Sequence, residues 1–347
     1  MNLKRALAAL AGPLLVLAGF AAPAHAATPD RFGFGMWDGG TAPPATKSPP
    51  ATTIVPWAVG RYRVTFPGQA ARGGVVHVTA IDPHGRWCQA AAFGQAGPDE
   101  LVFVDCYRPG GVRDWSGFTV VFNSSSGLTP AGLFGYVDVN PAGTVISEYN
   151  SSGALNSVGH TGVGVYEVKL PGLGTAGPFD GGLQVTAVGP NVGAHCKVGK
   201  WQSTPGAQYA VVLCFDAFGT RFDNRWTLTY QHKRAIYGGL APPKYFGYVW
   251  NAPPVGPAPT NFNSVLGLGF NSLVPAGPGL TMVRFPAIGI RPDDVQVTAF
   301  GPGPEYCGMN TPWAVFGNDA VVRDVNCWTP AATPVNTGFF TTYASQA

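Results

Sequence analysis

Cysteines are the residues of this chain whose spacing says most about its chemistry, because the six of them fall into three similar pairs. The pairs are Cys88 with Cys106, Cys196 with Cys214, and Cys307 with Cys327. A zinc site would need a C-x-x-C motif or histidines at ligand spacing, and these cysteines have neither. Residues that face each other across a hairpin lie equally far from its turn, and the midpoint of each pair falls in turn residues, at 95–98, 204–206 and 317–319. We therefore predict three disulfides, one within each pair.

Catalytic patterns are scarce by comparison. The motifs H-E-x-x-H and G-x-S-x-G are both absent. The histidines beyond the N-terminal segment occupy unrelated positions in the repeats described below: His77, His84, His160, His195 and His232. A hydrolase would have to rely on scattered carboxylates such as Asp82, Asp99 or Asp293, which neither recur nor pair. We expect no catalytic residue and predict that the protein is not an enzyme.

Two further patterns resemble binding motifs. Residues 172–177 satisfy G-x-G-x-x-G, but Pro178 follows and no helix is expected there to hold a phosphate at its N-terminus, so we interpret them as a turn. Asp114, Asp223 and Asn336 recur just before the last strand of each repeat, where an Asx side chain bonds the amides of a turn. A calcium ion would need more oxygen ligands than one per repeat. The sequence therefore predicts neither a cofactor nor a metal.

The elements that position these residues occur three times. A Val-Thr-Ala triplet begins each time at an equivalent place, at Val78, Val185 and Val297. A segment ending in proline precedes the triplet, at 60–67, 164–171 and 279–286, and a cysteine pair follows it. Apolar and polar residues alternate along these segments, which predicts half-buried strands. We predict an all-β fold of three tandem antiparallel β-sandwich or jelly-roll-like repeats of about 105 residues, with one intra-repeat disulfide each.

The N-terminus reads as a secretory signal. Lys4 and Arg5 precede an apolar run, and Ala24-His25-Ala26 forms a small-residue cleavage site. The predicted organisation is a signal peptide at 1–26 and β repeats at 31–127, 128–240 and 241–347. Cleavage near Ala26 would export the chain to a compartment that permits disulfides. Whether the repeats stand as separate beads or close around a pseudo-threefold axis is left open by the sequence.

Composition restricts the partners. Removing Lys4 and Arg5 from 21 basic residues leaves 19 against 18 acidic ones, a balance that argues against nucleic acid. No later apolar run reaches the roughly 18 residues of a membrane span. Abundant alanine, glycine and proline fit a GC-rich bacterial genome.

Aromatic residues are the remaining candidates for ligand binding. The residue after each second cysteine is aromatic: Tyr107, Phe215 and Trp328. Neighbours in a strand point to opposite faces, so these rings lie opposite the cysteines, where a row of rings could meet a sugar or peptide. The alternative is that they are simply part of the interior.

The repeated words Phe-Gly-Tyr-Val, Gly-x-Tyr-x-Val-x-Phe-Pro, Val-Gln-Val-Thr-Ala, Cys-x-Val-x-x-Trp and Val-x-Cys-Phe resemble repeats of secreted, uncharacterised bacterial proteins. The resemblance covers nearly all of the chain after the signal and is clearest in the second repeat; the third departs at Asp324 and Asn326. It implies the fold and export, and no activity. We expect a secreted, non-catalytic, multivalent binding or adhesion protein whose partner is a cell-surface glycan or protein. The alternatives are a structural protein of the envelope or extracellular matrix and a secreted hydrolase.

Overall fold

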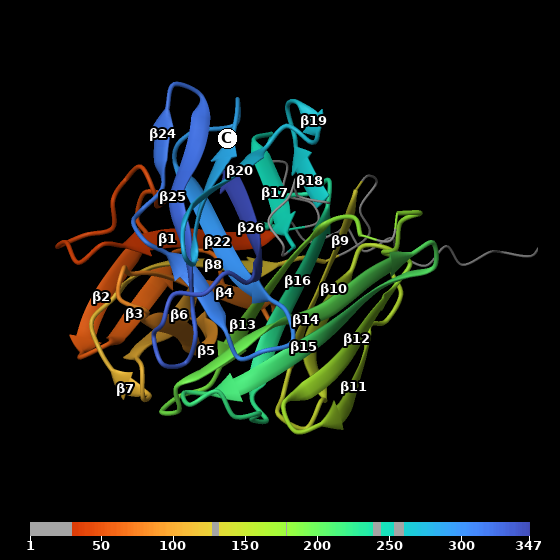
Figure 1. Ribbon diagram of the computed structural model, residues 1–347, viewed down its shortest axis with the longest axis horizontal. Helices are drawn as coiled ribbons and strands as arrows, with labels where there is room; N and C mark the ends of the chain where they lie inside the picture. Colours follow the sequence, from red (N-terminus) through yellow and green to blue (C-terminus); the bar gives the residue numbers. More distant parts are fainter. Residues whose placement is uncertain (1–29, 127–131, 178, 239–243, 253–259) are drawn as a thin grey trace, which may run out of the picture.

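The computed structural model describes residues 30–126, 132–177, 179–238, 244–252 and 260–347, which Figure 1 traces in colour. The predicted signal peptide and its cleavage site lie outside the described residues. Twenty-six strands form the regular secondary structure of these segments, so the prediction of an all-β fold is confirmed. Within them, no helix is long and apolar enough to cross a membrane.

The strands form three sheets. Sheet A contains, in order, β1 (Arg31–Trp37), β8 (Gly117–Ser124), β4 (Val75–Ile81), β23 (Tyr306–Met309), β25 (Asp319–Trp328), β21 (Leu280–Phe285) and β20 (Ser272–Gly277), with β24 (Ala314–Phe316) paired to β25. Sheet B contains β10 (Val145–Asn150), β9 (Leu133–Val139), β16 (Arg225–His232), β13 (Gly182–Val188), β5 (Trp87–Ala96), β6 (Asp99–Arg108), β3 (Arg61–Phe66) and β2 (Thr53–Ala58), with β7 (Val112–Arg113) paired to β6. Sheet C contains β11 (Ser157–Gly162), β12 (Val165–Pro171), β15 (Ala207–Asp216), β14 (Ala194–Thr204), β22 (Asp293–Phe300), β26 (Gly338–Ser345), β17 (Phe246–Asn251), β18 (Thr260–Asn263) and β19 (Gly267–Leu268).

Each sheet is shared by two repeats. Sheet A joins strands of the first and third repeats, sheet B those of the first and second, and sheet C those of the second and third. The junctions are parallel bridges, between β13 and β5, β14 and β22, and β23 and β4, whereas the other strand pairs are antiparallel. Each repeat is therefore a sandwich whose two layers continue into different neighbours.

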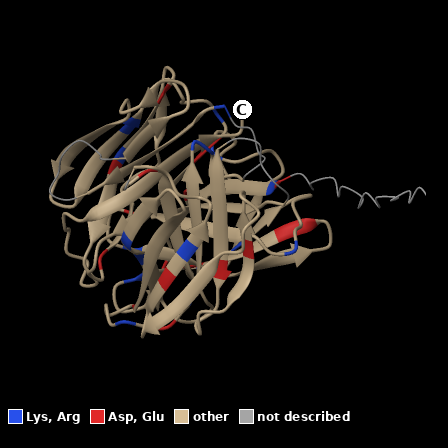
Figure 2. Cartoon of the chain, turned by 90° about the vertical axis from the view of Figure 1, so that its right-hand side faces the viewer, with Lys and Arg blue, Asp and Glu red and all other residues tan. Residues whose placement is uncertain are grey.

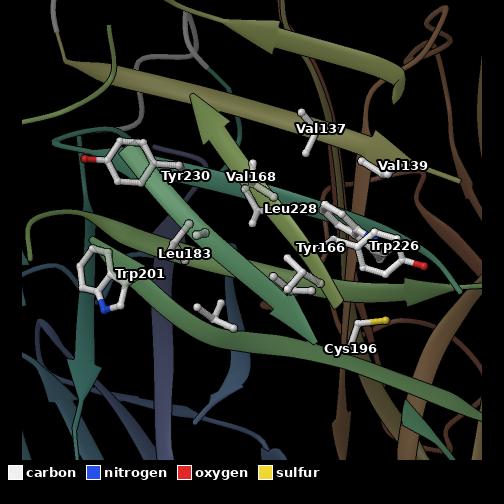
Figure 3. Close-up of a cluster of buried hydrophobic side chains, with 14 of the residues drawn as sticks. Val137, Val139, Tyr166, Val168, Leu183, Cys196, Trp201, Trp226, Leu228 and Tyr230 are labelled. Atoms are coloured by element: carbon white, nitrogen blue, oxygen red, sulfur yellow. The ribbon is translucent and has the colours of Figure 1, made fainter. Parts of the chain in front are cut away.

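The alternation seen in the sequence builds the core of each sandwich. In the first repeat, Tyr62, Val64 and Phe66 of β3 are buried in the same cluster as Val78 of β4 and Phe118 of β8, although β3 belongs to sheet B and the other two to sheet A. Figure 3 shows the equivalent core of the second repeat. The core of each repeat thus holds two different sheets together.

The polar residues of the Val-Thr-Ala strands are buried as well, where the three repeats meet. The amide of Val78 donates to Thr186 Oγ1 at 3.2 Å, that of Val185 to Thr298 Oγ1 at 3.2 Å, and that of Val297 to Thr79 Oγ1 at 2.9 Å. The third contact returns to the first repeat. The repeats therefore close around a pseudo-threefold axis, which answers the question that the sequence left open.

The three predicted disulfides are confirmed. Each bond joins the two cysteines of one pair, which face each other as register partners in a hairpin. The turns lie where the midpoints placed them, since Ala96 pairs with Asp99, Thr204 with Ala207, and Phe316 with Asp319. Two β-bulges lie between a disulfide and its turn, and the sequence did not reveal them. The pairing register shifts past residue 91 in β5 and past residue 199 in β14. These bulges change the side-chain phase between each disulfide and its turn.

Candidate binding site

The aromatic residues after the second cysteines lie in a buried cluster at the axis. Tyr107 and Phe215 are almost fully buried and Trp328 is half-buried. Tyr107 stacks on Trp87 with ring centroids 5.8 Å apart, and Phe215 stacks on His195 at 5.5 Å. Of the row that the sequence offered to a sugar or peptide, Tyr107 and Phe215 are therefore turned toward other rings, and Trp328 packs at the margin of the same cluster.

The inner members of this cluster are the residues before the first cysteines. Trp87, His195 and Tyr306 surround the axis with centroids 5.3 to 6.0 Å apart, beside a cavity of about 40 Å³. Burial lowers the pKa of His195 to about 4, and its Nε2 lies 2.8 Å from the carbonyl oxygen of Pro304. From the sequence, His195 was recognised only as one of several scattered histidines and neither Trp87 nor Tyr306 was predicted, although a ring directly before the first cysteine of every repeat was a readable signal. Their mutual packing makes the cluster a structural element of ring closure.

The other histidines are dispersed. His77 is buried at the axis, with Nε2 2.7 Å from Thr229 Oγ1. His160 lies 2.9 Å from Asp223 and His232 lies 3.0 Å from Asp180, on different strands of the second repeat. His84 is largely exposed.

The three carboxylates considered for hydrolysis do not form a site together. Asp293 is buried and accepts a 2.8 Å hydrogen bond from Lys47 Nζ. Asp99 begins β6 and accepts from the amide of Gly68. Asp82 follows β4 and lines a cleft of the first repeat. Their partners differ, and each carboxylate serves its own part of the fold.

The recurring turn motifs have structural roles in the second and third repeats. Asp223 Oδ1 accepts from the amide of Gly164, and Asn336 Oδ1 from the amide of Gly279, both glycines having positive φ at the start of a strand. In the glycine-rich run after β12, Gly172 has a φ of 74°. A Cβ at Gly174 would overlap the carbonyl oxygen of Thr204. These glycines are required by backbone geometry, and across the described ranges no three His, Cys, Asp or Glu side chains gather in a way that could hold a metal ion.

A cleft of about 600 Å³ opens at one end of the first repeat, and we call it the Trp115 cleft. Its walls come from the end of β1 with the following loop, from β2 and β3, and from the segment that leads into β8. Its lining includes Trp37, Asp38, Gly40, Tyr62, Asp82 and Trp115. A volume of this size is typical of small-molecule sites.

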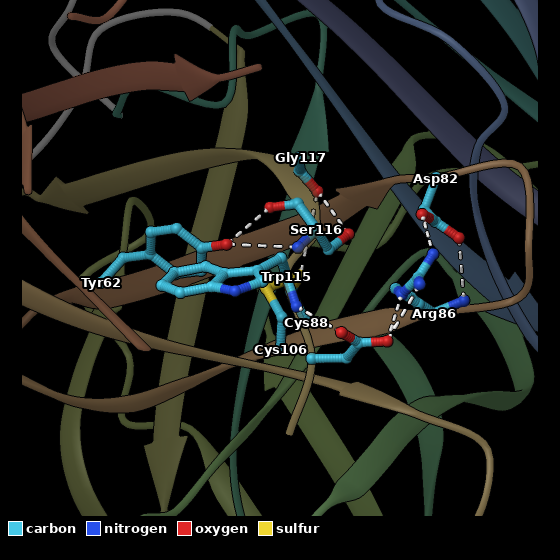
Figure 4. Close-up of a disulfide and its surroundings, with 9 residues drawn as sticks. Tyr62, Asp82, Arg86, Cys88, Cys106, Trp115, Ser116 and Gly117 are labelled. Atoms are coloured by element: carbon cyan, nitrogen blue, oxygen red, sulfur yellow. Dashed lines mark hydrogen bonds and ion pairs between the residues drawn. A yellow bond between two sulfur atoms is a disulfide. The ribbon is translucent and has the colours of Figure 1, made fainter. Parts of the chain in front are cut away.

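Three aromatic rings form one side of the Trp115 cleft. The Tyr62 ring lies 5.9 Å from Trp115, edge to face, and 6.0 Å from Trp37. Tyr62 is fixed, because its hydroxyl donates to the carbonyl of Ser116 at 3.0 Å and accepts from the Ser116 amide at 3.2 Å (Figure 4). Trp115 is 49% exposed, so much of its ring faces solvent. The fixed tyrosine thus supports a tryptophan whose ring is half exposed.

One guanidinium ties Asp82 of the cleft lining to Asp114, the residue before Trp115. Arg86 pairs with Asp82 at 2.8 Å between nitrogen and oxygen (Figure 4). Its other terminal nitrogen lies 2.9 Å from an oxygen of Asp114. Partial burial raises the pKa of the Asp114 carboxyl, but hydrogen bonds from Arg86 and from the Trp115 amide outweigh it, so the pKa lies below its ordinary value. The Arg86 bridge therefore keeps Asp114 ionised and holds the segment that carries Trp115.

Asp38 supplies a carboxylate at the mouth of the Trp115 cleft. Its Oδ1 accepts from the amide of Gly40 at 2.9 Å, which shapes the Gly39–Gly40 loop. Gly39 has a φ of 90°, a conformation that favours glycine. This exposed loop brings polar groups of side chain and backbone opposite the rings.

The equivalent places in the other repeats are built differently. In the second repeat Tyr166 replaces Tyr62, but its hydroxyl donates to the carbonyl of Pro141 and the His160 ring stacks on it at 4.9 Å. In the third repeat the equivalent residue is Thr281. The combination of an exposed tryptophan with fixed aromatic support thus belongs to the first repeat.

Comparison with protein-family models finds no match to this chain. Comparisons with curated protein sequences and with solved structures likewise find no similar protein.

Proposed function

We propose that the protein is a non-catalytic carbohydrate-binding protein and that the Trp115 cleft holds the sugar. The observation that carries the proposal is the half-exposed Trp115 ring, supported by Tyr62 beside a cleft of about 600 Å³. The apolar face of a pyranose packs on an aromatic ring, and its hydroxyls need hydrogen-bonding groups around the rim. The carboxylate of Asp38, the backbone groups of Gly39 and Thr41 and the carbonyl of Gly40 provide them, since the Gly40 amide is already bonded to Asp38.

Charged groups are sparse on this protein, and they do not gather into a large field of one sign on the face shown in Figure 2. Charged residues are 11% of the chain, and on the face in Figure 2 blue and red positions are scattered among tan strands. Attraction by a large field of one sign therefore contributes little to binding. Contacts with rings, with hydroxyl-binding groups and with single charged side chains remain as the source of affinity.

The state of the carboxylates favours binding over hydrolysis. Hydrolysis of a glycosidic bond needs two carboxyl groups placed on either side of it, one of them protonated. At the Trp115 cleft, Asp82 and Asp114 share the Arg86 guanidinium. This engagement leaves Asp38 as the carboxylate available to a sugar, and one carboxylate binds hydroxyls without supplying both roles.

The proposed sugar site lies in one repeat, whereas the sequence led us to expect multivalent binding, with a site in each repeat. It also includes export: the three disulfides are compatible with an oxidising compartment, and we propose cleavage near Ala26. N-terminal analysis of protein recovered from the medium of the producing cells tests this part.

A glycan array followed by calorimetry tests the binding function. The array is probed with the oxidised protein and with Trp115→Ala, and we expect the variant to lose about tenfold or more in affinity, as removal of an aromatic anchor does. Phe218→Ala is the matched control, because Phe218 is 75% exposed and lies in a turn of the second repeat. Binding that Trp115→Ala leaves unchanged, or the absence of any glycan signal, would contradict the proposal.

A further inference from the structure

The Trp115 cleft borders an edge of sheet B that is free of further strands among the described residues. Strand β2 is the last strand of sheet B and pairs with β3 on one side. Pro56 of β2 lines the cleft, opposite Tyr62 in the register. The next residue, Trp57, belongs to a second hollow on the outer face of the same sheet. The two surfaces are thus separated by the width of one strand.

This second hollow has a volume of about 350 Å³, and we call it the Trp57 shelf. Its lining residues are Val55, Trp57, Arg63 and Phe103. Val55 faces Arg63 across the β2–β3 pair, and Arg63 faces Phe103 across the β3–β6 pair, so three of the four form a row across the sheet. Trp57 is 56% exposed. An exposed indole beside Val55, the Arg63 stem and Phe103 is a second surface on which a sugar ring can lie.

The Trp57 shelf is braced and carries a positive charge. The Arg61 guanidinium lies over the Trp57 ring, 4.9 Å from its centroid, and is itself placed 3.6 Å from Asp105. Arg63 is exposed and, within the described residues, forms no ion pair. A planar guanidinium without a counter-ion binds a carboxylate through two parallel hydrogen bonds. The shelf therefore suits a sugar that bears a carboxylate.

The edge itself favours a polar ligand over an added peptide strand. The unpaired side of β2 presents backbone N–H and C=O groups to solvent, and these can bond hydroxyl groups. Strand addition needs a regular ladder, but Pro56 has no N–H and the register shifts between Pro56 and Ala58. A chain that bonds through many hydroxyls tolerates this irregularity.

We propose that the ligand is an acidic oligosaccharide that fills the Trp115 cleft, crosses the free edge of β2 and places a carboxylate-bearing sugar on the Trp57 shelf against Arg63. This inference rests on the proposed function and adds the class of ligand and its extent. Monosaccharides would reach one of the two surfaces, and longer chains would reach both.

Calorimetry with oligosaccharides of defined length tests the inference. The acidic probes are aldouronates of one to six residues in total, in which a neutral xylose chain carries one uronate at its end, so that no carboxylate need meet Asp38 in the cleft; neutral xylose oligomers of the same lengths are compared with them. With the unaltered protein, affinity for the aldouronates is expected to rise at least about tenfold from the monomer to the longest chain. Xylose oligomers are expected to gain less with length, and high salt is expected to reduce the difference between the two series.

Two variants separate the Trp57 shelf from the Trp115 cleft. Trp57→Ala is expected to remove most of the gain with length, and Arg63→Gln to remove the preference for uronates, while Phe218→Ala changes neither. Uronates bound no tighter than xylose oligomers of equal length, or a gain with length that Trp57→Ala leaves intact, would overturn the inference. If binding remains sensitive to Trp115→Ala in that case, the proposed function stands without the extended ligand; if no probe or array glycan binds, the proposed function fails as well.

Discussion

Replacing His77 tests whether the axis where the repeats meet is held by an uncharged imidazole. His77 is buried, with Nε2 2.7 Å from Thr229 Oγ1 and Nδ1 3.4 Å from Thr186 Oγ1. Burial lowers the pKa of His77 from 6.5 to about 3. An imidazole that is protonated in the unfolded chain but not in the folded one favours unfolding in acid. His77→Gln keeps a polar side chain of similar reach and removes the titration.

The sign and size follow from proton linkage. Because the folded pKa of His77 is the lower one, its contribution to the free energy of unfolding is complete above pH 6.5 and is lost as the pH falls toward 3. The whole difference corresponds to about 5 kcal/mol, of which about 2 kcal/mol is lost between pH 7 and pH 5. Asp294 and Glu100 act in the opposite direction, since burial raises the pKa of each carboxyl to about 7 and their stabilising effect is lost as the pH rises. The pH profile of the unaltered protein therefore mixes opposed effects.

The difference between variant and unaltered protein isolates His77. Urea unfolding followed by tryptophan fluorescence at pH 5, 6, 7 and 8 is expected to show that His77→Gln loses about 2 kcal/mol less than the unaltered protein between pH 7 and pH 5. His84→Gln removes a largely exposed imidazole and is the control. If the curves of His77→Gln and the unaltered protein run parallel, His77 is equally charged in the folded and unfolded chains and the reasoning is refuted.

Two further predictions concern contacts in the described fold. Lys47→Met leaves the buried Asp293 without its 2.8 Å partner and is expected to lower the free energy of unfolding in urea at pH 7 by about 3–5 kcal/mol. Adding Asp293→Asn should restore most of this loss. A double variant no more stable than the single one would contradict the ion-pair argument. Gly174→Ala is expected to lower the free energy of unfolding by about 1–3 kcal/mol, because the new Cβ overlaps the Thr204 carbonyl oxygen. Gly206→Ala is the control, since its new Cβ meets open space. Equal stability of these two variants in the same assay would show that the overlap is relieved at no cost.

The sequence predicted the disulfides, turns and buried strand faces that lie within one repeat. Short-range relations decide these features: cysteines pair across a hairpin, and alternate residues of a strand face one side. The turns at Gly97, Gly206 and Gly317 and the buried side chains of Tyr62 and Val78 follow from them. The bulges in β5 and β14 did not, because inserting one unpaired residue leaves the composition of a strand unchanged.

The relations between repeats could not be read in the same way. Each junction between repeats is a single parallel bridge supported by threonine side chains, and threonine is equally common on exposed strand faces. The sequence did not predict the Trp115 cleft, for a different reason. Trp115 lies in a segment where the first repeat has one more residue between Asp114 and its closing strand than the others have, so a comparison of shared positions passes over it.

The third repeat helps to build the cleft of the first. The amide of Asp82 donates to the carbonyl of Met309 at 2.8 Å, and the carbonyl of Asp82 accepts from Asn326 Nδ2 at 2.7 Å. Asn326 is buried and stands where the repeat pattern favours an apolar residue. Its amide fixes the backbone of the residue whose carboxylate holds Arg86, and Arg86 in turn holds the segment that carries Trp115 through Asp114. Closure of the ring is therefore a condition for the shape of the Trp115 cleft, and the departure at Asn326 from the repeat pattern has a physical reason.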